Sequence, residues 1–193
     1  MRRAAAAIAI GLSAAAPLAG VRVPSYPDAP PPGMTGGFGE PTCVACHFAP
    51  SEPDTGGVLI LRGVPASYAP GHEYVLSIEL ERAGLERAGF EVSSRFSEGC
   101  ESGRQAGVLA APDAGAAVTE AAGVQYAHHT EPGTRPAERG RARWTLRWTA
   151  PDRASGPVAF HVAGNAANGD GSALGDRVYA IEATTAAEPL TGC

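Results

Sequence analysis

Alternation of apolar and polar residues recurs through most of the chain and predicts β-strands. The clearest case is residues 143–149, where Trp144, Leu146 and Trp148 would face one side of a strand while arginines and threonines face the other. Turns rich in Gly, Pro and Asp separate such segments, and helical periodicity is almost absent. The pattern predicts an all-β fold, an antiparallel immunoglobulin-like β-sandwich over residues 57–185. Its other strand signals lie at 58–61, 74–81, 90–96, 158–163 and 177–183.

One stretch inside the sandwich is ambiguous. Residues 106–122 are rich in alanine and could form a short helix, but their glycines and Pro112 favour a loop. We therefore expect a loop between two strands at this place.

The segment before the strands has a different composition. Residues 21–42 contain six prolines, and several glycines follow them just before Cys43. This much proline prevents a helix, and a stretch of this composition need not form a core. We expect residues 21–56 to form a Pro/Gly-rich arm, and residues 186–193 to form a C-terminal tail after the sandwich.

The first residues are typical of a signal peptide. Two arginines follow Met1, and an alanine-rich apolar run extends over residues 4–16. The run is too short and too weakly hydrophobic for a convincing membrane anchor, and a disordered alanine-rich tail is the alternative. We expect a signal peptide over residues 1–20, no membrane span after its removal, and a periplasmic, extracellular or cell-surface protein.

The arm contains five consecutive residues with a specific chemistry, Cys43-Val44-Ala45-Cys46-His47. Cys-x-x-Cys-His is the attachment motif of c-type haem, in which both sulfurs add to the porphyrin vinyl groups and the histidine binds the iron. The motif predicts one covalent haem c on Cys43 and Cys46, with His47 as the proximal ligand. The cysteine pair could instead be a disulfide, half of a zinc site or a redox-active dithiol.

The sixth iron position has several candidates. His129 is the first and His161 the second, although each could be a structural histidine. Met34 could supply a thioether, and we expect His72, in a turn, to be solvated. An open sixth position would favour ligand binding or sensing over electron transfer.

Charge and missing motifs exclude several functions. The chain has a formal net charge of −5, and its fifteen basic residues are all arginines. An acidic protein does not suit the phosphate backbone of nucleic acid, so no nucleic-acid partner is expected. No Ser-His-Asp order, phosphate-binding loop or pair of carboxylates stands out. The sequence favours an electron carrier or a binding module over an enzyme.

Two further features are weaker. Cys100 and Cys193 could form a disulfide in an oxidising compartment. Oxygen ligands at a Gly-rich turn make calcium conceivable, but the spacing lacks the EF-hand pattern and a plain turn is favoured. These oxygen ligands are Asn165, Asn168, Asp170 and Asp176.

The order of short motifs along the strands resembles the Reeler domain, and more closely its bacterial choice-of-anchor relatives. Those relatives place a Cys-x-x-Cys-His segment before the sandwich and an Asn-Gly…Gly-Asp stretch near its end, here Asn168-Gly169 and Gly175-Asp176. The resemblance implies an immunoglobulin-like sandwich in an exported protein and little about activity. The motifs within the sandwich are Tyr68-x-Pro70-Gly71-x-x-Tyr74, Gly89-Phe90-Glu91, His129-Thr130, Trp148-Thr149-Ala150-Pro151 and Gly156-x-Val158-x-Phe160.

Two functions follow from these observations. The first is an exported monohaem c-type protein that transfers electrons to a redox partner protein the sequence does not identify. The second is a non-enzymatic extracellular adhesion or binding module in which the haem is structural or sensory.

Overall fold

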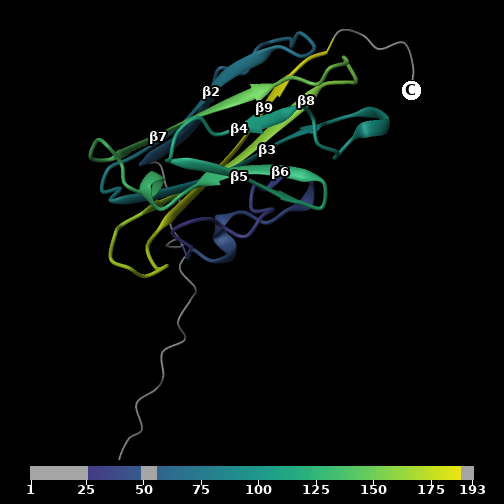
Figure 1. Cartoon of the computed structure of the whole chain (residues 1–193). Coiled ribbons are helices and arrows are strands. Elements are labelled where there is room, and N and C mark those ends of the chain that lie inside the picture. Colours follow the sequence, from purple (N-terminus) through teal and green to yellow (C-terminus); the bar gives the residue numbers. More distant parts are fainter. Residues whose placement is uncertain (1–25, 49–55, 188–193) are drawn as a thin grey trace, which may run out of the picture.

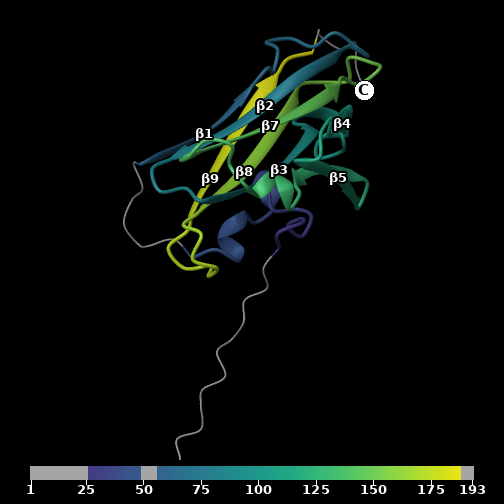
Figure 2. The same cartoon turned by 60° about the vertical axis from the view of Figure 1, so that its left-hand side comes forward.

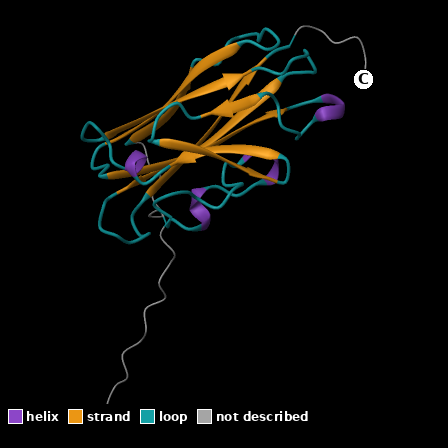
Figure 3. Cartoon of the chain, viewed as in Figure 1, coloured by secondary structure: helices purple, strands orange, loops and turns teal. Residues whose placement is uncertain are grey.

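The computed structural model describes residues 26–48 and 56–187 (Figure 1). The described chain is all β, with only short 3-10 helices between the strands (Figure 3). The strands are β1 (Gly57–Arg62), β2 (Glu73–Arg82), β3 (Arg87–Phe96), β4 (Val108–Ala110), β5 (Ala116–Ala121), β6 (Val124–His129), β7 (Arg141–Thr149), β8 (Val158–Ala167) and β9 (Arg177–Thr185). The short helices are η1 (Gly37–Gly39), η2 (Cys43–Ala45), η3 (Gly99–Glu101) and η4 (Pro132–Thr134).

The strands form two sheets that pack face to face (Figures 1 and 2). One sheet has the order β1-β2-β7-β4 and the other has the order β5-β6-β3-β8-β9. Every pairing between neighbouring strands is antiparallel. The predicted antiparallel, immunoglobulin-like β-sandwich is confirmed.

The core lies between the two sheets and contains the residues that the alternation placed there. In β7, Trp144, Leu146 and Trp148 are buried, while Arg143 and Arg147 on the opposite face are exposed. Trp148 packs edge-on against Phe160 of β8 in the opposite sheet, with ring centroids 4.9 Å apart. Buried aromatic side chains of this kind contribute much of the apolar area that stabilises a sandwich.

Strand β3 differs from a half-buried strand because both of its faces are covered. The alternation of residues 90–96 would leave Glu91, Ser93 and Arg95 on an outward face, yet all three are buried. Phe90 and Val92 face the core as expected. The cover on the outer face comes from the N-terminal arm.

The arm packs against the outer face of the five-stranded sheet (Figure 2). Glu40 forms an ion pair with Arg95, and the hydroxyl of Tyr126 lies 2.6 Å from both the guanidinium and the carboxylate. Gly37 lies so close to His161 that a Cβ atom there would be 2.3 Å from the imidazole Cγ. The prolines and glycines prevent a helix here, but they do not prevent close packing.

Residues 106–122 form neither a helix nor a single loop, so that prediction was wrong. They contain β4, which pairs with β7, and β5, which pairs with β6, both antiparallel at sheet edges. Pro112 lies between the two strands, where no ladder hydrogen bond is needed. Pairing with neighbouring strands therefore outweighs the low strand propensity of alanine.

Some expectations fall on other parts of the chain. The signal peptide over residues 1–20 and the end of the tail at residues 188–193 lie outside the described residues. Within the described ranges, no helix combines the length and the apolar character needed to cross a bilayer.

Candidate functional site

The Cys-x-x-Cys-His motif lies on a tight turn of the arm. η2 begins after Thr42, whose hydroxyl accepts a hydrogen bond from the Val44 N–H. The N–H groups of Cys46 and His47 donate to the carbonyl of Cys43, at 3.1 and 2.9 Å. Because residues three apart are eclipsed in a 3-10 helix, the two cysteines lie on the same side of the turn.

This turn forms part of the wall of a cavity of about 420 Å³, a volume typical of cofactor sites. The cavity also touches the start of β3, the ends of β6 and β8, and the loop between β8 and β9. Figure 2 shows η2 beside that last loop, and an isolated bridge between Phe48 and Leu174 joins the two segments. Seven residues singled out from the sequence for haem attachment, iron or calcium line the cavity: Met34, Cys43, Cys46, His47, His129, Asn165 and Asp176.

His47 is held by a buried carboxylate from the other end of the chain. Its Nδ1 lies 2.6 Å from Oδ2 of Asp176, which is only 1% exposed, although 129 residues separate the two. The amide nitrogen of Asn165 is 3.4 Å from the same oxygen, and the N–H of Asn168 donates to Oδ1 at 3.2 Å. Asp176 was named from the sequence as a weak calcium ligand and as part of the Gly175-Asp176 motif, but neither observation paired it with His47.

Both cysteines of the motif are free thiols and are half-buried. Burial, together with the nearby charge of Glu91, raises the pKa of the Cys43 thiol to about 12. Reactive redox cysteines instead have lowered pKa values, because the thiolate is the nucleophile. Cys43 therefore does not resemble the attacking thiol of a dithiol enzyme.

A cysteine pair can also be half of a zinc site. A structural zinc site needs four closely grouped ligands, commonly cysteines and histidines. Among the described residues, no three His, Cys, Asp or Glu side chains are grouped so that they could hold one metal ion.

His129 reaches the cavity from the end of β6. Its Nδ1 lies 3.1 Å from the Phe90 nitrogen and 3.2 Å from the Phe90 carbonyl oxygen, and its Nε2 lies 3.1 Å from the Tyr26 carbonyl oxygen. In a neutral ring with the proton on Nε2, Nδ1 accepts from the Phe90 N–H and Nε2 donates to the Tyr26 carbonyl. Burial lowers the pKa of His129, which favours this neutral form. If His129 bound a metal ion through Nε2, the contact between Nε2 and the Tyr26 carbonyl would have to break.

Met34 lines the cavity above a buried acid that sequence reasoning did not identify. The Met34 N–H donates to Oε2 of Glu91, which is completely buried, while Oε1 has no hydrogen-bond partner. Burial raises the pKa of this carboxyl to about 7, although the N–H groups of Met34 and Gly33 partly oppose the rise. The alternation of β3 placed Glu91 on an outward face, and the Gly89-Phe90-Glu91 motif assigned it no role, so no sequence signal indicated a buried acid.

The other two histidines considered from the sequence do not line the cavity. The His161 ring lies edge-on to Phe38, with centroids 5.2 Å apart, and its Nε2 is 3.0 Å from Glu182. His72 is exposed and its ring lies against Tyr74.

The candidate calcium ligands are engaged in other hydrogen bonds. Asp170 accepts from the Ser172 N–H and from the side chain of Asn168, a pattern of Asx turns. Oδ2 of Asp176 lies beside Nδ1 of His47, and the amide of Asn165 donates to the same oxygen of Asp176. The segment forms a hydrogen-bonded turn beside the cavity.

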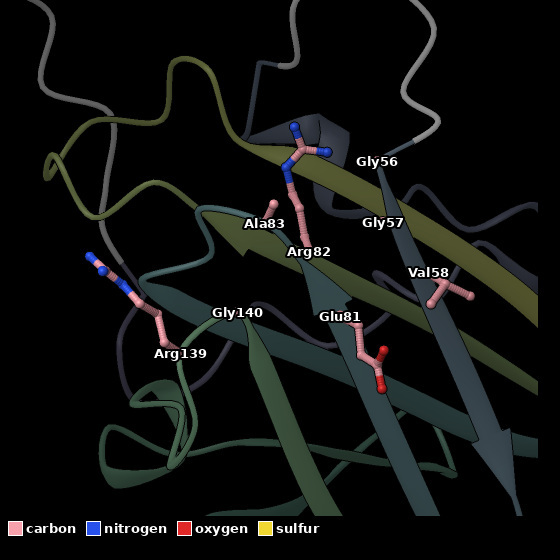
Figure 4. Close-up of a pocket in the computed structure, with 8 residues that line it drawn as sticks. All are labelled: Gly56, Gly57, Val58, Glu81, Arg82, Ala83, Arg139 and Gly140. Carbon is pink, nitrogen blue, oxygen red and sulfur yellow. The ribbon is translucent and has the colours of Figure 1, made fainter.

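A second hollow of about 500 Å³ lies over the ends of β1, β2 and β7, away from these residues (Figure 4). Its charged side chains, Glu81, Arg82 and Arg139, point in different directions and do not converge. It is wide and open, with no Cys or His on its wall. We therefore place the functional site at the cavity beside η2.

Cys100, at η3, is disulfide-bonded. Cys193, with which the sequence pairs it, lies outside the described residues.

Comparisons with known proteins find solved structures that are similar to this chain. No family model matches the chain, and no curated protein matches its sequence. The Reelin-N domain of F-spondin is similar in structure, with 18% identity, coverage of 76% of this chain and 96% of that one, and a TM-score of 0.47. A human F-spondin reeler domain gives 21% identity, coverage of 63% and 83%, and a TM-score of 0.41.

A DUF4466 family protein from Parabacteroides merdae is also similar, with 13% identity, coverage of 68% of this chain and 44% of that one, and a TM-score of 0.43. At TM-scores below 0.5, none of these structures bears on what the cavity does.

Proposed function

We propose that this chain is an exported monohaem c-type protein that transfers electrons, with haem c attached at Cys43 and Cys46 and bound through His47. The observation that supports it is that both thiols and the imidazole line one cavity. The sequence motif alone requires only that the three residues be adjacent along the chain. The predicted signal peptide supports export, because c-type haem is attached outside the cytoplasm.

The lining of the cavity fits such a group in its chemistry. Its wall combines prolines, alanines, glycines and Phe90 with a small set of polar groups, as cofactor sites do. Both thiols are free, as addition to a vinyl group requires. Cys43 and Cys46 would each supply the sulfur of a sulfur–carbon bond, and the thiol hydrogen would go to the neighbouring carbon of the vinyl group.

The residues of the chain have separate tasks in this proposal. Cys43 and Cys46 would hold the haem covalently, and His47 would offer Nε2 to the iron, since Nδ1 is engaged by Asp176. Arg87 lines the cavity, donates to Thr134 and has no ion pair with a described residue, so its guanidinium is available for the carboxylates of a porphyrin. Bound there, haem would supply a one-electron iron couple.

His129 is the sixth ligand in this proposal. It is the only histidine besides His47 among the described residues that line the cavity. Its lowered pKa keeps the ring neutral, as a metal ligand must be. Nε2 would exchange its bond to the Tyr26 carbonyl for one to iron. If it keeps that bond, the iron has an open position, and a sensory binding module becomes the better account.

The test is a spectroelectrochemical titration of protein produced with a c-type maturation system. Electron transfer predicts a reversible one-electron change and a six-coordinate ferrous spectrum that added carbon monoxide does not alter. A ferrous protein that binds carbon monoxide at once would contradict the electron-transfer proposal and favour the sensory one.

A further inference from the structure

The surroundings of Asp176 are more specific than haem attachment requires. Two N–H donors and one ring nitrogen approach its carboxylate: the Asn165 amide at 3.4 Å, the Asn168 N–H at 3.2 Å and Nδ1 of His47 at 2.6 Å. The side chain is 1% exposed, so water screens these contacts little. The Asn165 and Asn168 N–H groups can only donate, which suits an ionised carboxylate, because that group can only accept.

The short contact determines which nitrogen of His47 carries the proton. Since an ionised Asp176 has no proton to donate, the hydrogen of the 2.6 Å bond belongs to Nδ1 of His47. In the neutral imidazole, which is the form that binds a metal, Nε2 is then unprotonated and keeps its lone pair. The Asn165 amide nitrogen lies 3.1 Å from Nδ1 and 3.5 Å from Nε2, and it donates to Asp176 at 3.4 Å, because a protonated Nδ1 has no lone pair to offer.

The backbone holds the two side chains together. Phe48, which follows His47, donates its N–H to the Ala173 carbonyl at 2.8 Å. Gly175, which precedes Asp176, donates its N–H to the Phe48 carbonyl at 3.0 Å. This pair of bonds joins the motif turn to the loop between β8 and β9, so the Asp176–His47 contact belongs to a fixed piece of structure.

We propose that Asp176 is the positioning residue of the iron ligand: it fixes the Nδ1–H tautomer of His47, directs Nε2 to the cavity and strengthens the ligand as a donor. This rests on the proposed haem function. A carboxylate that accepts the outer N–H of a ligating histidine raises its basicity. A more basic ligand and a buried negative charge both favour ferric over ferrous iron, so Asp176 lowers the reduction potential.

The test uses Asp176→Asn, which keeps the shape and removes the charge. Asp170→Asn is the matched control, because Asp170 lies in the same loop, is exposed and contacts Asn168 and Ser172 but not His47. Loss of such a partner typically changes metal affinity by 10–100-fold. If the affinity for ferric iron falls by this factor and that for ferrous iron does not, the reduction potential of Asp176→Asn rises by about 60–120 mV. Each factor of ten in affinity corresponds to about 59 mV. Asp170→Asn should match the wild type.

Haem content, measured on the same samples, separates this inference from the proposed function. A loaded Asp176→Asn protein with the wild-type potential overturns the positioning role, while haem attachment stands. A wild type that never takes up haem defeats the proposed function instead.

A second readout needs neither haem nor a stable variant. Nitrogen-15 NMR of the labelled haem-free wild type reports which nitrogen of His47 is protonated. A proton on Nδ1 supports the assignment, and a proton on Nε2 overturns it even where the potential cannot be measured.

Discussion

Glu91 allows a quantitative test of how the arm packs on the sandwich. The carboxyl lies on the outer face of β3, fully buried beneath the arm, and one of its oxygens has no partner. Burial raises its pKa from the ordinary value of 4.5 to about 7, with the N–H groups of Met34 and Gly33 opposing the rise. Removal of the arm from this face would return the carboxyl to water and its pKa to the ordinary range.

The sign and size of the effect follow from linkage. Because the pKa is higher in the folded than in the unfolded protein, the folded state holds the proton more tightly. The resulting stability is complete below about pH 4.5 and is lost as the pH rises through about 7. A rise of the pKa from 4.5 to about 7 corresponds to roughly 3 kcal/mol of unfolding free energy.

The assay compares urea unfolding of the wild type and Glu91→Gln from below pH 4.5 to above pH 7, followed by tryptophan fluorescence. As the pH rises, the free energy of unfolding of the wild type should fall by up to about 3 kcal/mol relative to that of Glu91→Gln. Other titrating groups, such as His129, are common to both proteins and cancel. Glu73→Gln, at an exposed carboxylate paired with Arg147, is the control and should follow the wild type. Parallel curves for wild type and Glu91→Gln would refute the buried position of this acid.

Two further outcomes are expected. Trp148→Ala should lower the free energy of unfolding by about 3–5 kcal/mol in urea titrations, because the side chain is completely buried against Phe160 and Tyr68. A loss below about 1 kcal/mol would contradict the core packing. In haem-loaded protein, His129→Ala should abolish the six-coordinate ferrous spectrum, and the ferrous protein should then bind carbon monoxide. His161→Ala should change neither property. The reverse result would make His161 the ligand.

The sandwich could be predicted because its strands carry their own signal. In β7 the side-chain period of two matches the burial of Trp144, Leu146 and Trp148 residue by residue. The same reasoning failed over residues 106–122, where composition suggested a helix or a loop. The edge strands β4 and β5 exist there because β7 and β6 offer pairing partners, which local composition does not encode.

The chemistry of the site could be predicted from the residues that are adjacent in sequence, whereas Met34 and His129 were named as candidates without any pattern that placed them at the same cavity. The spacing of Cys43, Cys46 and His47 identifies a possible chemistry without any knowledge of the fold. The contact between His47 and Asp176 spans 129 residues and arises only when the loop after β8 meets the arm. The burial of Glu91 likewise depends on the arm, whose composition indicated no particular packing partner.

The most direct test of the proposed function is a pyridine haemochrome spectrum of denatured protein that has been produced with a c-type maturation system. The matched sample is a Cys43→Ala/Cys46→Ala double variant prepared in the same way. One covalent haem per chain in the wild type, absent from the double variant, is the predicted result. A wild type without a c-type band, in a host that loads a known c-type cytochrome, would contradict the account and leave the motif as a cysteine pair on a binding domain.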